Sequence, residues 1–146
     1  MNEDLESKIK ERKKQAERRK ISSKAWAVAK YLGDRSYYRT SDGHLEQTTY
    51  TFEKDDFLIT NEFTESHGHD GSMGGGSTTV DYRKKTVFYE AGAGIISYIP
   101  GDWEKKLTKL YGQAVKASEQ KAKEEEEKRK ELAKQEEDKE KAKWGL

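Results

Sequence analysis

Apolar side chains are concentrated in the middle of this chain, and both ends are strongly polar. Most of the β-branched and aromatic residues lie within Thr48–Ile99, whereas Met1–Lys20 and Lys116–Lys143 contain almost none. Because a hydrophobic core requires apolar side chains, we expect the folded domain to be shorter than the chain. The pattern predicts a solvated basic helix over residues 1–20, a globular α+β domain over 21–117 and a charged helical extension over 118–146.

The N-terminal segment contains no glycine or proline before Gly33 and is rich in Glu, Lys, Arg and Ala, which favour a helix. On a helical wheel, Leu5 and Ile9 share one face, while later apolar residues share another. These later residues are Ile21, Ala25, Val28 and Leu32. The change of phase suggests that Ser22 or Ser23 caps a second, shorter helix. Gly33 predicts its end, because glycine tolerates the left-handed backbone conformation common there.

Short runs with a period of two follow, separated by turn residues such as Asp42-Gly43. This alternation and the Asp-Gly pair are typical of β-hairpins. The runs are Arg35–Thr40, Gln47–Glu53, Phe57–Phe63, Thr78–Arg83, Thr86–Glu90 and Gly94–Ile99. Since most connections are short, neighbouring strands should be antiparallel. We expect an α+β fold in which a four- to five-stranded antiparallel meander is flanked by an N-terminal helix and a long charged C-terminal helix.

Ser66–Ser77 is the longest connection, and it holds five of the twelve glycines. Such a segment has high backbone entropy and few side chains to pack. We expect an exposed, mobile loop.

The C-terminal helix should begin after Asp102, a good N-cap residue. The apolar side chains of its first turns fall within a narrow arc, which predicts packing on the sheet. They are Trp103, Leu107, Leu110, Ala114 and Ala117. Beyond Lys121, acidic residues precede basic ones by three or four positions, an arrangement that supports a solvated helix.

The composition excludes several classes of protein. Basic and acidic residues nearly balance, at 29 and 28, so the net charge of +1 favours neither nucleic acid nor membrane as partner. With no cysteine, the chain has no disulfide, thiolate metal site or cysteine nucleophile. The N-terminus lacks the apolar region of a signal peptide, and no apolar run is long enough to span a membrane. We expect a cytoplasmic protein.

Two imidazoles and two carboxylates lie close together in the segment Glu65–Asp70. In an extended chain, residues i and i+2 project to the same side, so His67 and His69 could chelate one ion. Glu65 or Asp70 would then be the third ligand. This arrangement is the basis of one hypothesis, a small metal-dependent enzyme using His67, His69 and Asp70. The alternative is a polar loop without a physiological metal.

Other catalytic signatures are missing from the sequence. The glycine run at Gly74–Gly76 precedes a predicted strand instead of a helix, and no Gly-Lys-Ser or Gly-Lys-Thr follows, so a phosphate-binding loop is not indicated. No Gly-x-Ser-x-Gly nucleophile elbow occurs either. We therefore assign no catalytic residue, and no cofactor other than the divalent metal of the preceding hypothesis.

Eight basic residues and only two acidic ones lie within Lys8–Lys20. A basic helix can bind phosphates through counterion release, so nucleic acid is a second alternative partner. The residues proposed for this contact are Lys13, Lys14, Arg18 and Arg19. Because the charges surround the helix, a solvated helix or docking to the acidic stretches near the C-terminus is the competing interpretation.

The predicted sheet contains more aromatic side chains than one small hydrophobic face requires. Tyrosine is enriched at binding surfaces, so an exposed aromatic face would suit a macromolecular partner. The residues proposed for it are Tyr50, Phe52, Tyr82 and Tyr89. The leading hypothesis is a non-enzymatic interaction module that binds another protein or self-associates, through this face or the charged helices.

Overall fold

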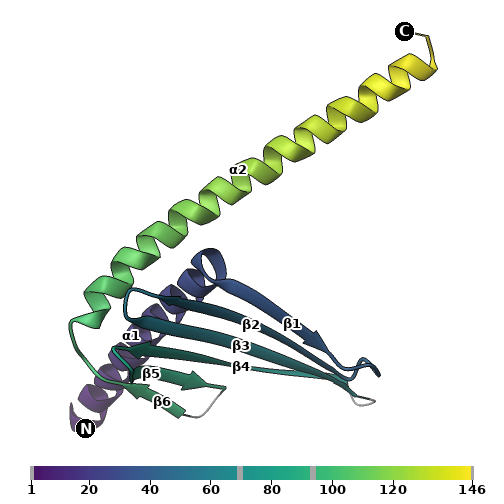
Figure 1. Cartoon of the computed structure of the whole chain (residues 1–146). Helices are drawn as coiled ribbons and strands as arrows, with labels where there is room; N and C mark the ends of the chain where they lie inside the picture. Colours follow the sequence, from purple (N-terminus) through teal and green to yellow (C-terminus); the bar gives the residue numbers. More distant parts are fainter. Residues whose placement is uncertain (1, 69–70, 93–94, 146) are drawn as a thin grey trace.

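The computed structural model describes residues 2–68, 71–92 and 95–145. The chain begins with helix α1 (Asn2–Leu32), continues through one antiparallel sheet and ends with the long helix α2 (Trp103–Lys143) (Figure 1). The strands are β1 (Asp34–Arg39), β2 (Leu45–Lys54), β3 (Phe57–Gly68), β4 (Gly71–Tyr82), β5 (Lys85–Ala91) and β6 (Ile95–Tyr98). The α+β class is confirmed, with six strands instead of four or five.

The six strands form a meander, in which each strand pairs with the next one along the chain. The turns Asp55-Asp56 and Arg83-Lys84 each contain only two residues, and all four residues have positive φ angles between 52° and 66°. Such turns match the right-handed twist of the strands they join. The edge strands β1 and β6 lie at the candidate runs Arg35–Thr40 and Gly94–Ile99, so all six runs named from the sequence form strands.

The expectation of a mobile loop at Ser66–Ser77 was wrong. Strands β3 and β4 run through most of this segment and pair over twelve positions, including Glu65 with Gly74 and His67 with Ser72. Glycine has no side chain that could contribute to an alternation of apolar and polar residues, so this segment shows no strand pattern in the sequence. The glycines are strand residues because β3 supplies a hydrogen-bonding partner along their whole length.

The core lies on one face of the sheet, beneath the second half of α1 and the first turns of α2. Alternate residues of β3 and β4 point into it, and Phe88 of β5 is fully buried. The helices contact each other as well, since Lys24 Nζ donates a 3.0 Å hydrogen bond to Thr108 Oγ1. The main buried apolar residues are Ile21, Ala25, Val28, Phe52, Phe57, Ile59, Val80, Tyr82, Phe88, Trp103, Leu107, Leu110 and Ala114.

The opposite face of the sheet is left open by the described elements. Residues that alternate onto it, such as Thr49 and Thr60, are half-buried by their neighbours within the sheet, and Leu58 is 37% exposed. This face is rich in threonine, which is compatible with solvent contact.

Helix α1 continues through Ile21 without the break that the change of apolar phase suggested. The phase change instead marks where the helix reaches the core, because Ile21 is the first buried residue among those described. Gly33 ends the helix, but its φ is not positive. The glycine is required by close approach, since a Cβ there would lie 2.3 Å from the carbonyl oxygen of Thr51.

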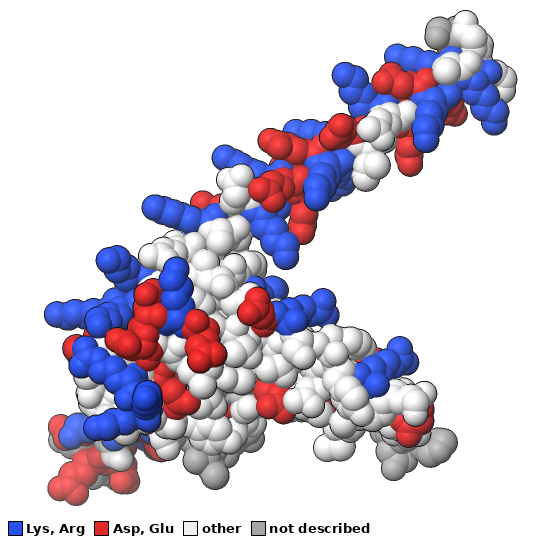
Figure 2. Space-filling view, in the orientation of Figure 1, with Lys and Arg blue, Asp and Glu red and all other residues white. Residues whose placement is uncertain are grey.

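The second half of α2 projects away from the sheet (Figure 1). Every residue from Glu119 to Gly145 is exposed, and charges of both signs alternate along the helix (Figure 2). Ion pairs four residues apart, such as Glu126–Lys130 at 3.7 Å, stabilise it in water. Within the described ranges, neither helix has an apolar stretch that could cross a membrane.

Candidate functional site

The strands β2, β3 and β4 extend well past the helices, so the sheet has a part that no helix covers. We call this part, residues 37–39, 45–48, 63–68 and 71–76, the distal sheet. Its boundary is visible in the burial pattern, because Asn61 and Thr78 are the last buried residues of β3 and β4 on the core side. The distal sheet carries two groups of side chains that could bind a metal ion or a partner. Both lie on the face that continues the core.

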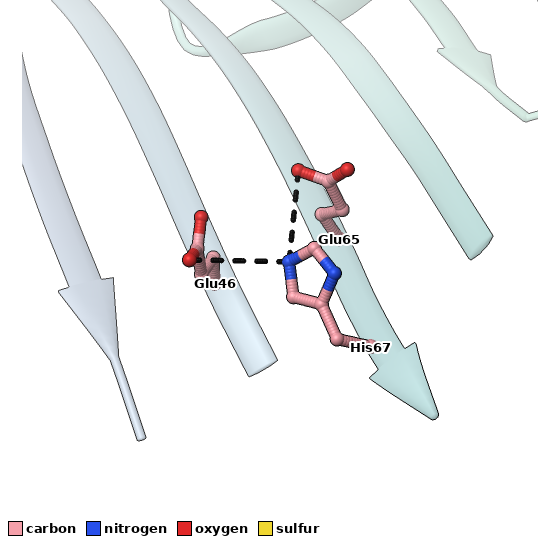
Figure 3. A group of neighbouring side chains, drawn as sticks. All are labelled: Glu46, Glu65 and His67. Atoms are coloured by element: carbon pink, nitrogen blue, oxygen red, sulfur yellow. Dashed lines mark ion pairs between the residues drawn. The ribbon is translucent and has the colours of Figure 1, made fainter. Parts of the chain in front are cut away.

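The first group is a histidine between two carboxylates (Figure 3). Nε2 of His67 lies 3.9 Å from Oε1 of Glu46 and 3.9 Å from Oε2 of Glu65. One donor atom of each residue lies within 4.8 Å of the others. Glu46 and Glu65 are directly opposite each other on β2 and β3, and a like-charged pair at such a position is destabilising unless a cation compensates it.

The orientation of the His67 ring is fixed by β4. Its Nδ1 lies 2.9 Å from Oγ of Ser72, the cross-strand partner of His67. A ring that donates Nδ1–H to this hydroxyl turns the Nε2 lone pair toward the two carboxylates. Metal-binding histidines are held in this way by a partner on the other ring nitrogen. Three ligands of this kind suit a borderline ion such as Zn²⁺.

The β1–β2 turn holds this group in place. Asp42 accepts hydrogen bonds from the Thr40 hydroxyl, at 2.6 Å, and from the His44 amide, at 3.1 Å. These bonds stabilise the carboxylate, so they lower the pKa of Asp42, with the Thr40 hydroxyl as the larger cause. The amide of His67 donates in turn to the carbonyl of His44, at 2.7 Å.

Arg39 of β1 already neutralises part of the charge, since its Nε lies 3.5 Å from Oε1 of Glu46. Both side chains are solvent-accessible, and exposed ion pairs of this kind are weak. The three charged groups Arg39, Glu46 and Glu65 leave a net charge of −1 at neutral pH.

The structure brings together two of the residues that the sequence suggested for a metal. Glu65 and His67 project to the same side of an extended strand, as their spacing predicted. His69 and Asp70 lie outside the described residues. Glu46 was missed because it is 19 positions from Glu65 in the sequence, and only the register of the β2–β3 hairpin places the two side by side.

The second group is an aromatic surface where the distal sheet meets α1. Trp26, Tyr37 and Phe63 are 42%, 51% and 50% exposed, and Tyr50 is half-buried between them and the core. We call these four residues the aromatic shelf. A hollow of about 220 Å³ opens here, lined by Trp26, Thr48, Tyr50, Phe63 and Thr78 with the buried Asn61.

The four aromatic residues proposed from the sequence do not form one surface. Phe52 and Tyr82 are each 5% exposed and belong to the core beneath the helices. Tyr89 lies on the open, opposite face, because it pairs with Thr79. Only Tyr50 belongs to the aromatic shelf. Trp26, Tyr37 and Phe63 were missed for this role because the sequence alone does not show how far the helices reach along the sheet.

The basic residues Lys13, Lys14 and Arg19 of α1 are exposed, and Arg18 is half-buried. Adjacent residues of a helix point about 100° apart, so these four charges do not form one stripe. The nucleic-acid hypothesis stays a prediction. Its signature would be an affinity that falls steeply with salt and is lost when these charges are reversed.

Comparisons of the chain with protein-family models, with curated proteins and with solved structures give no match.

Proposed function

We propose that this protein is a non-enzymatic interaction module that binds a segment of another protein on the aromatic shelf. The observation that carries the proposal is that the exposed rings of Trp26 and Phe63 line one hollow, and that the exposed Tyr37 lies on the same face, paired with Thr48 of that hollow. Aromatic side chains are enriched in the energetically important part of interfaces, because they bury large areas with few rotatable bonds. The neighbouring charges of Glu46 and Glu65 favour a partner segment with basic residues.

A photo-crosslinking amino acid placed at position 63 tests this proposal. The matched control is position 58, which lies on the same strand but on the opposite, open face. We expect a crosslinked protein from position 63 and none from position 58. The protein identified in this way should then bind the purified chain. Its affinity for the Trp26→Ala variant should be at least about tenfold lower, since a buried aromatic anchor typically contributes that much.

Three results would contradict the proposal. Equal crosslinking from both positions, or none from position 63, would show that the shelf is not the binding surface. Crosslinks between two copies of this chain would assign the shelf to self-association instead of a separate partner.

A second candidate function is divalent-metal binding, favoured by the donor atoms of Glu46, Glu65 and His67 within 4.8 Å of one another. Calorimetric titration with Zn²⁺ should give a one-to-one complex that His67→Ala and Glu65→Gln abolish. His44→Ala is the matched control, because His44 uses its Nδ1 for the carbonyl of His67 and is not one of the three donors. Unchanged binding by His67→Ala would remove this candidate, and His69→Ala tests the ligand proposed from the sequence.

A further inference from the structure

Asn61 and Thr78 are the two residues classed as buried and polar in the described part of the chain, and Asn61 is the more buried of them. It is only 6% exposed, at the point where β3 leaves the cover of α1. Its Oδ1 accepts a hydrogen bond from the Thr78 hydroxyl at 2.5 Å, but its Nδ2 has no hydrogen-bond partner among the described residues. A buried donor left without a partner costs stability, so such a group calls for an explanation.

The position of Asn61 suggests that explanation. It lines the hollow of about 220 Å³, with the aromatic side chains of Trp26, Tyr50 and Phe63 around it. This volume is smaller than the roughly 300–1,000 Å³ typical of small-molecule and cofactor sites. The hollow therefore suits a single large side chain. A lone amide donor beside it is complementary to one carbonyl oxygen, which an adjoining peptide bond supplies.

Trp26 lines the hollow together with Asn61, and it is the side chain that we expect to move when a ligand reaches Asn61. The Nδ2 atom has almost no exposed surface, so a ligand reaches it only after a neighbouring side chain has moved. Trp26 contacts Tyr31 edge-on, with ring centroids 6.5 Å apart, and Lys30, whose Nζ lies 4.5 Å from the indole centroid. Because these contacts are on the helix surface and the ring is 42% exposed, its rotation disturbs little of the core.

The charges beside the hollow define a second contact. Phe63 pairs with Thr48 across β2 and β3, and the next pair on the same face, two residues further along, is Glu46 with Glu65. Two residues of a strand span roughly 6.8 Å, which is also the spacing of side chains i and i+2 in an extended peptide. A cationic side chain two residues from the apolar anchor would therefore lie over the two carboxylates.

We infer that the hollow binds one aromatic or large aliphatic side chain of an extended peptide, whose carbonyl accepts a hydrogen bond from Asn61 and whose lysine or arginine two residues away faces Glu46 and Glu65. This inference rests on the proposed function, because it names the chemistry of the partner segment. The free energy lost by leaving Asn61 without a partner in the free protein is recovered when the peptide binds.

Short peptides test the inference on the full chain. The probes are acetyl-Phe-Ala-Lys-amide and acetyl-Lys-Ala-Phe-amide, which cover both chain directions, and NMR titration locates their binding. We expect shifts at the Asn61 side-chain amide and the Trp26 indole with at least one of them. Replacing Phe by Ala in the peptide should weaken binding roughly tenfold or more, because the anchor burial is lost. Replacing Lys by Glu should weaken it about two- to fivefold, as expected for an exposed ion pair.

A double variant separates a binding role of Asn61 from a structural one. In Asn61→Leu/Thr78→Val, both partners of the buried hydrogen bond become apolar side chains of similar shape, a change that is neutral or stabilising when a buried group was unsatisfied. We expect an unchanged or higher melting temperature together with loss of peptide binding. The matched control is Thr60→Val/Thr79→Val, a cross-strand pair on the same two strands that faces the open side, and it should bind as the wild type does.

Two results would overturn the inference. One is the absence of any shift at Asn61 and Trp26 with all peptides, and the other is wild-type affinity in the Asn61→Leu/Thr78→Val variant. The crosslinks from position 63 decide the proposed function separately. A partner captured there without peptide binding in the hollow would leave the interaction module standing and remove only this peptide chemistry.

Discussion

The ring of Phe63 lies over Gly74, so closely that a Cβ at position 74 would be 3.0 Å from the Cζ atom of the ring. Gly76 is also beneath this ring, with its hypothetical Cβ 3.5 Å from Cδ2. The glycines of β4 therefore leave the space in which Phe63 lies flat on the sheet. An aromatic ring that covers glycine on a neighbouring strand compensates for the missing side chain.

This relationship predicts different effects on stability for substitutions of two adjacent glycines. Gly75 faces the other side of β4, where a Cβ would meet nothing within 4 Å. Gly75→Thr should stabilise the protein by about 0.5–1 kcal/mol, since a β-branched residue in a strand restricts the unfolded chain. Gly74→Thr should displace Phe63 and give no such gain. Urea unfolding measures both variants, and equal stabilisation by the two would contradict the placement of Phe63.

Features of this fold that depend on residues close together in the sequence could be predicted, whereas features that depend on contacts between distant strands could not. The Asp42-Gly43 pair and the arc of Trp103, Leu107 and Leu110 are local signals, and the structure has the β1–β2 connection and the start of α2 at these positions. The strand through Gly71–Gly76 is not a local signal, because its stability comes from pairing with β3 and from the Phe63 ring.

The candidate sites show the same division. Glu65 and His67 could be paired from their spacing within one strand, whereas Glu46 joins them only through the hairpin register. The aromatic shelf depends on a longer-range property, the point at which α1 stops covering the sheet. The sequence therefore does not show the role of Trp26, although this residue lies in the range 21–117 that was expected to form the globular domain.

Gly33 provides a prediction about the junction between α1 and β1. Because a Cβ there would lie 2.3 Å from a main-chain oxygen of Thr51, which cannot move independently of β2, Gly33→Ala should destabilise the protein by roughly 1–3 kcal/mol. Gly112→Ala is the matched control. It lies in α2 with nothing within 4 Å of its hypothetical Cβ, so helix propensity should stabilise it by about 1 kcal/mol. Urea denaturation gives both values, and a neutral Gly33→Ala would show that the junction is loosely packed.

The environment of Tyr98, at the end of the sheet, predicts that the free energy of unfolding depends on pH. Its hydroxyl donates a hydrogen bond to Glu104, and burial, reinforced by this carboxylate, raises the pKa of Tyr98 to about 12. In the unfolded chain a tyrosine has a pKa of about 10. The native state therefore holds this proton more tightly than the unfolded chain does. The resulting contribution of Tyr98 to the free energy of unfolding is complete below about pH 10 and is lost as the pH rises toward 12.

The measurement is the free energy of unfolding between pH 9 and 12 for the wild type and Tyr98→Phe. We expect the difference between them to shrink as the pH rises through this range. Tyr38→Phe is the control, because Tyr38 is 57% exposed and should follow the wild type throughout. A constant difference between wild type and Tyr98→Phe would contradict a role for this proton.

The projecting part of α2 should be dispensable for the stability of the domain. The last buried residue of the helix is Ala114, and every residue from Glu119 to Gly145 is exposed, so deleting residues 121–146 removes helix without removing core contacts. We expect a loss of helical circular dichroism with a melting temperature close to that of the full chain. Leu107→Ala, in the same helix but 1% exposed, should instead cost about 2–5 kcal/mol, because it leaves a cavity beneath α2. A large fall in melting temperature on truncation would mean that the charged extension folds back to support the sheet, and its exposed length could then not be treated as free for a partner.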